Sequence, residues 1–147
     1  MTTNEKNNAT FIHLSTLTQY FFPFGNYIFP ILLWSSKKNE SEFVDFNGKQ
    51  TLNFQLSILL YSLLLLFISV PILIYSLFTN VTFSNYNNYD FDNFPIEKIT
   101  GILIVGIIAG LLFCFIKAME FFLIIYAAVK SSNGELYKYP LTIPFFK

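Results

Sequence analysis

The sequence contains little charge, no arginine and a single cysteine. Only 12% of its 147 residues are charged, whereas an average soluble domain has roughly 25%. Nine lysines balance nine acidic residues, so the formal net charge is zero and there is no basic excess for binding nucleic acid directly. The single cysteine, Cys114, excludes an intrachain disulfide framework and a cysteine-based zinc site.

Hydrophobic residues make up 54% of the chain and are gathered in blocks. Two long runs fall within 50–78 and 99–129, and only Lys117 and Glu120 interrupt the second one. About 20 mostly apolar residues suffice to cross a hydrocarbon core about 30 Å thick. A soluble helix of this length would normally show a polar face along its whole length, and neither 56–78 nor 99–129 has one. The sequence therefore predicts transmembrane helices at about 50–78 and 99–129.

A third uncharged segment, 11–34, contains Pro23, Gly25 and Pro30. Proline removes a backbone donor and glycine weakens a helix, so the segment can be a kinked span, a broken span or a re-entrant hairpin. The limbs of a hairpin would have about 11 and 9 residues, too short to cross separately. We favour a single broken or kinked span. The predicted fold is an all-α integral membrane protein with three transmembrane helices.

The whole chain, 1–147, then forms one membrane domain. The loop 35–49 and the tail 130–147 then lie on the same side of the membrane, and the loop 79–98 lies on the opposite side. The first side has six lysines, against Lys6 and Lys98 on the second. The positive-inside bias puts the loop 35–49 and the C-terminal tail in the cytoplasm. If 11–34 were a hairpin, only the N-terminus would change side.

Lys117 and Glu120 stand out because charges near the centre of a membrane helix are costly. At 100° per residue they share one helix face with Gly106, Gly110 and Cys114. Two glycines four apart allow backbones to approach closely, so this face is predicted to pack on protein. This face can line a polar path or dock a partner helix. Alternatively, Lys117 and Glu120 form a structural ion pair in which the lysine partly snorkels, and we favour this last interpretation.

A polar stripe follows one side of the predicted helix 50–78 and consists of Gln50, Asn53, Ser57 and Tyr61. It can line a shallow cavity, but we favour hydrogen bonding between helices. His13 has no Cys, Asp or Glu near it in sequence, which favours a structural role over metal binding. The sequence shows no motif for catalysis, so we expect neither an enzyme nor a cofactor or metal site.

Three blocks of the sequence match a pattern found in small membrane proteins. They are His13-Leu14-Ser15 with Pro23-Phe24-Gly25-Asn26 and Pro30; Phe43–Gln50 with Asn53-Phe54-Gln55; and Asn133-Gly134-Glu135 with Tyr139–Ile143. This pattern resembles a bacterial membrane-protein family of unknown function, related to the twenty-kilodalton subunit of the chloroplast inner-envelope import translocon (Tic). The resemblance implies a compact bundle of three or four helices in the bacterial cytoplasmic membrane.

The matching blocks fall mostly on the predicted cytoplasmic side. There Asp45, Gly48, Lys49, Tyr139 and Pro140 are predicted to form a folded rim that contacts another protein. The hypothesis is a non-enzymatic accessory subunit of a larger membrane complex, in protein translocation or insertion. The alternative is a small homo-oligomeric channel or transporter. The expected partners are membrane lipid and either other membrane proteins, of the translocon type, or further copies of the chain.

Overall fold

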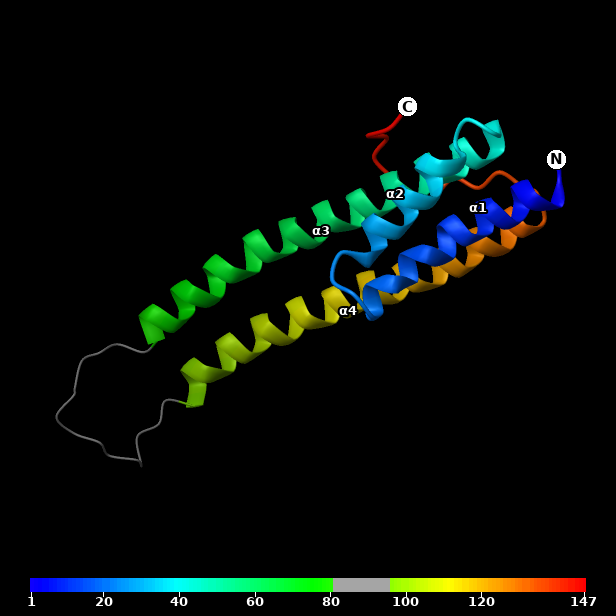
Figure 1. The fold of residues 1–147 in the computed structure, drawn as a ribbon. Coiled ribbons are helices and arrows are strands. Elements are labelled where there is room, and N and C mark those ends of the chain that lie inside the picture. Colours follow the sequence, from blue (N-terminus) through cyan, green and yellow to red (C-terminus); the bar gives the residue numbers. More distant parts are fainter. Residues whose placement is uncertain (81–95) are drawn as a thin grey trace. The chain divides into compact units, whose positions relative to one another are not determined.

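The computed structural model describes residues 1–80 and 96–147, and side chains outside 76–102. Its elements, in chain order, are α1 (Thr3–Ser15), the 3₁₀ helix η1 (Thr16–Tyr20), α2 (Gly25–Lys37), α3 (Glu42–Asn80) and α4 (Ile96–Ser132). Figure 1 shows this order along the chain. The described part contains no strand, so the predicted all-helical class is confirmed.

The prediction of three spans is wrong, because two helices are long and apolar enough to cross a membrane. These are Glu42–Tyr75 of α3 and Leu103–Ser132 of α4. Only 6% and 11% of their most apolar windows are buried, unlike the core helices of a soluble protein. Large apolar surfaces of this kind face lipid or another protein.

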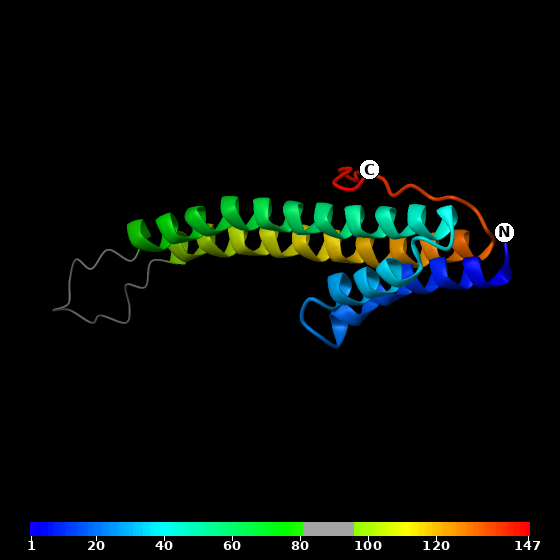
Figure 2. The same cartoon turned by 45° about the horizontal axis from the view of Figure 1, so that its top comes forward.

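The first segment folds as a hairpin and not as the favoured single span, broken or kinked. α1 and α2 pack together and run antiparallel, with η1 at the end of α1 (Figures 1 and 2). Each helix has 13 residues, slightly more than the limbs expected from the sequence. The segment does not continue as one span because the chain turns back at residues 21–24.

Local sequence explains both ends of this hairpin. Thr2 and Glu5 form a capping box, which starts α1 eight residues before the predicted apolar segment begins at Phe11. At the turn Phe24 has a φ of 61°, a left-handed conformation, and Gly25 follows as the first residue of α2. A Cβ on Gly25 would lie 2.8 Å from the backbone of Thr18, so only glycine fits there.

α3 begins at Glu42, inside the segment 35–49 that was predicted as a loop, so the connection from α2 is limited to residues 38–41. The predicted tail is close to what is observed, since α4 ends at Ser132. Most of the predicted loop 79–98 lies outside the described residues.

The chain divides into two compact units, which we describe separately. Unit 1 comprises residues 1–60 and 117–147, and unit 2 comprises residues 61–116. Unit 1 has an apolar core of Phe54, Ile124, Ala127 and Tyr139. In unit 2 none of the described side chains is buried, as expected for helices that face lipid.

Candidate functional site

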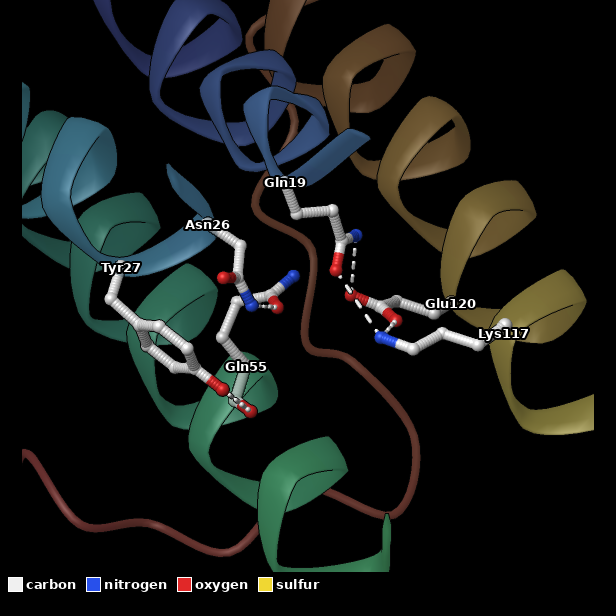
Figure 3. A network of polar contacts seen from close by, with 6 residues as sticks. All are labelled: Gln19, Asn26, Tyr27, Gln55, Lys117 and Glu120. Atoms are coloured by element: carbon white, nitrogen blue, oxygen red, sulfur yellow. Dashed lines mark hydrogen bonds and ion pairs between the residues drawn. The ribbon is translucent and has the colours of Figure 1, made fainter. Parts of the chain in front are cut away.

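Most of the side-chain hydrogen bonds between described residues lie inside unit 1. The first group of them is centred on Glu120. Its side chain is fully buried, and its Oε2 accepts from Lys117 Nζ at 2.8 Å. Its Oε1 accepts from Gln19 Nε2 of η1 at 2.9 Å, and Gln19 Oε1 accepts from Lys117 Nζ at 3.2 Å. Figure 3 shows this closed triangle. It joins the end of the hairpin to α4 and leaves neither oxygen of the buried carboxylate unpaired.

A second polar contact connects α2 with α3 (Figure 3). Asn26 Nδ2 donates to Gln55 Oε1 at 2.8 Å, and the hydroxyl of Tyr27 donates to the carbonyl of Gln55 at 3.4 Å. Gln55 is fully buried, and its Nε2 has no hydrogen-bond partner among the described residues. An unpaired buried donor costs about 1–3 kcal/mol, so this position reduces the stability that the contact provides.

His13 is the centre of a third polar cluster, which ties together α1, α3, α4 and the tail. His13 Nε2 lies 3.0 Å from Asn47 Oδ1, which also accepts from Ser131. Asn47 Nδ2 donates to a backbone carbonyl, so its Oδ1 is an acceptor and His13 Nε2 carries the proton. His13 Nδ1 then accepts from Tyr139, at 2.9 Å, or from Thr51, at 2.8 Å. Burial lowers the pKa of His13 to about 4, so the ring is neutral at pH 7.

The polar stripe of α3 binds the C-terminal tail. Asn53 Oδ1 accepts from the amides of Phe145 and Phe146, and Asn53 Nδ2 donates to the carbonyl of Phe146. Ser57 accepts from the amide of Ile143 at 2.9 Å. Gln50 lines a groove together with Asn53 and Phe146. The last member of the stripe, Tyr61, belongs to unit 2. Asn53 and Ser57 therefore supply hydrogen-bond partners to the backbone of the tail, which is not part of a helix.

Trp34 is the organising residue of the rim. Its Nε1 donates to Asp45 Oδ1 at 2.9 Å, and Asp45 Oδ2 pairs with Lys49 Nζ at 2.6 Å. The indole also packs edge-on against Phe146. Of the other predicted rim residues, Tyr139 is buried and stacks on Phe54, while Pro140 is exposed.

The residues of the predicted glycine face are divided between the two units. Gly106, Gly110 and Cys114 belong to unit 2, whereas Lys117 and Glu120 belong to unit 1. A Cβ added to either glycine would meet no described atom within 4 Å, and Cys114 is exposed. Gln19, Gln55 and Trp34 were not among the predicted site residues. Gln19 and Gln55 are uncharged polar residues next to apolar runs, and Gln55 also ends one of the three sequence blocks.

Gly48 gives a direct test of this rim. A Cβ at position 48 would lie 2.1 Å from Cδ1 of Trp34, so Gly48→Ala must displace the indole. We expect a loss of about 1–3 kcal/mol in the free energy of unfolding, the usual cost of overpacking. The chain has one tryptophan, so its fluorescence should shift to longer wavelength in detergent micelles.

The matched control is Gly106→Ala, a glycine inside α4 with no described atom near its Cβ position. It should stabilise the helix by about 0.5–1 kcal/mol, because alanine has the higher helix propensity. Unchanged fluorescence and thermal stability in Gly48→Ala would show that the indole does not pack on residue 48.

The structure describes no group of three or more His, Cys, Asp or Glu side chains that could hold a metal ion. Its buried polar groups instead connect elements of unit 1 to one another. The arrangement fixes a short helical hairpin and a tail against α3 and α4.

Comparison with known families gave one match. The profile of the magnetosome magnetite crystal formation protein family (MamF/MmsF) matches residues 4–146. Comparisons with curated proteins and with solved structures gave no match. Together with the two apolar helices, the family indicates a membrane protein.

This match corrects three sequence-based expectations. The resemblance to the translocon-related family was wrong, because the matching family is a different one. The roles in protein translocation and as a channel or transporter were wrong as well, because the family is linked to the formation of magnetite crystals. The resemblance rested on short blocks of the sequence.

Proposed function

The chain belongs to the magnetosome magnetite crystal formation protein family, and from this premise we propose that it acts in magnetite crystal formation as a non-enzymatic membrane protein. The observation that carries the proposal is the extent of the family match, which covers both candidate spans and all but the first residue of the hairpin. The non-enzymatic role is supported by the buried polar groups, which bind other parts of the fold. His13, Asn53 and Glu120 each bind another element of the fold.

We propose further that the chain crosses the membrane of the magnetosome twice, with both termini on the cytoplasmic side. Lys6 Nζ of α1 donates to the carbonyl of Asn133 at 3.4 Å, so the start of α1 lies beside the end of α4. Lysines are concentrated at this end: Lys6, Lys37, Lys38, Lys49, Lys130, Lys138 and Lys147. Lys98 alone belongs to the segment that links the two candidate spans. The positive-inside bias favours the lysine-rich end in the cytoplasm.

The test uses a magnetite-forming bacterium whose genome encodes this chain, and deletes the gene for the chain. We expect crystals of altered size or shape by electron microscopy, and restoration of both by the wild-type gene. The matched control is the same gene with its start codon removed, which should not restore them. The tagged protein should be recovered in the purified magnetosome fraction and resist extraction by salt and by alkali. Crystals of unchanged size, shape and number in the deletion strain would overturn the proposal.

A further inference from the structure

We propose that the hairpin formed by α1, η1 and α2 enters one leaflet of the bilayer from the lysine-rich side and turns back inside it. Its tip consists of Tyr20, Phe21, Phe22 and Phe24, and contacts the acyl chains of phospholipids. The inference goes beyond the proposed function, because it assigns a lipid-binding surface to a segment that does not cross the membrane.

The length of the limbs permits entry but not crossing. The returning limb, α2, has 13 residues, which corresponds to about 20 Å at a rise of 1.5 Å per residue, and the shorter limb sets how far a hairpin can reach. The hydrocarbon core is about 30 Å thick. A hairpin of this length can therefore reach into the bilayer and return to the same surface.

Contacts within unit 1 give the depth of the tip along α4. At the open end of the hairpin Lys6 lies beside Asn133, and at the tip the ring of Tyr20 contacts Phe121 with centroids 6.5 Å apart. Phe121 is about 18 Å from Asn133 along the helix axis. Phe121 belongs to the candidate span Leu103–Ser132, so the tip contacts a residue of this span.

Near the tip of the hairpin, aromatic side chains point outward, whereas Thr16 and Asn26 are buried. Phe21 is 81% exposed and Phe24 72% exposed, and no charged residue occurs from 7 to 36. α2 adds further exposed apolar side chains: Ile28, Phe29, Ile31, Leu32 and Leu33. A water-facing surface would show the opposite arrangement.

Several polar side chains near the tip have partners within the protein, which a lipid environment favours, and the buried Gln55 Nε2 is the exception described above. Gln19 binds Glu120 and Asn26 binds Gln55 (Figure 3). The hydroxyls of Thr16 and Thr18 donate to backbone carbonyls three residues earlier in the chain. The tip therefore presents apolar groups outward while Thr16, Thr18, Gln19 and Asn26 bind inside the protein, and this combination points to acyl chains as its partner.

The experiment is cysteine labelling of the full chain in a Cys114→Ser background. Single cysteines replace Asn4 near the start of α1, Asn39 just after the end of α2, and Phe22 at the tip. All three positions are exposed. Inside-out and right-side-out membrane vesicles are treated with a membrane-impermeant maleimide. We expect positions 4 and 39 to be labelled from the same side, and position 22 from neither side.

A spin label at position 22 then identifies what surrounds the tip. In liposomes of phosphatidylethanolamine and phosphatidylglycerol, its relaxation should respond to lipid-soluble oxygen and not to a water-soluble nickel chelate. A label at Phe122, a 70% exposed residue of α4, is the matched control. Labelling of positions 4 and 39 from opposite sides would overturn the proposal, as would access of the chelate to position 22. A tip insensitive to both reagents would mean that protein covers it, which also overturns the proposal. None of these readings depends on crystal formation, so the two proposals can fail separately.

Discussion

Replacing Glu120 by alanine is expected to lower the free energy of unfolding of unit 1 by about 3 kcal/mol. Removing one partner of a buried ion pair costs about 3–5 kcal/mol, because the other charge stays behind without compensation. The substitution would leave Lys117 Nζ and Gln19 Nε2 without the carboxylate they share. Lys117 is 33% exposed and can move toward more polar surroundings, so we expect a loss at the lower end of this range.

Thermal unfolding followed by circular dichroism in detergent measures this loss. Glu120→Gln keeps an acceptor for Lys117 and loses the acceptor for Gln19 Nε2, so it should be milder than Glu120→Ala. The double variant Lys117→Met with Glu120→Gln removes both charges together and should unfold near the wild-type temperature. If the double variant is as unstable as Glu120→Ala, the charges have a role beyond satisfying each other.

The charged pair itself could be predicted from the sequence, but its third member could not. Two residues three apart on a helix share a face, and the structure has Lys117 and Glu120 paired at 2.8 Å. Gln19 is about 100 positions away along the chain and reaches Glu120 only because the hairpin lies beside α4. Local periodicity carries no information about a contact of that kind.

The two spans could be predicted because length and hydropathy are local properties. The path of the first segment could not, because an uncharged stretch of this length fits a crossing as well as a hairpin. The difference depends on the backbone at one turn, where Phe24 adopts a left-handed conformation and Gly25 packs on Thr18. The start of α3 was missed for a related reason. Gly48 was interpreted as part of a loop, whereas it lies inside the helix and makes room for Trp34.

Acidification is the second condition expected to have a large effect, through His13. The pKa of this buried ring is lowered from 6.5 to about 4 by burial, and the hydrogen bond with Asn47 offsets part of the decrease. Between pH 6.5 and 4 the unfolded chain therefore binds a proton that the folded chain does not bind. Stability is complete above pH 6.5 and falls as the pH decreases toward 4. The total loss is about 3 kcal/mol, at 1.36 kcal/mol per pH unit.

The groups that surround His13 do not compensate for this proton. Burial raises the pKa of Tyr139, which stays neutral throughout the range, and Asn47, Thr51 and Ser131 do not titrate in it. Unfolding temperatures of the wild type should therefore fall from pH 6.5 to 4.5, and be constant from pH 7 to 8. His13→Gln keeps a donor for Asn47 and has no proton to gain. It should be less stable than the wild type at pH 7 but show a much smaller dependence on pH. Equal slopes in the two proteins would show that the loss comes from carboxylates elsewhere in the chain and not from the His13 cluster.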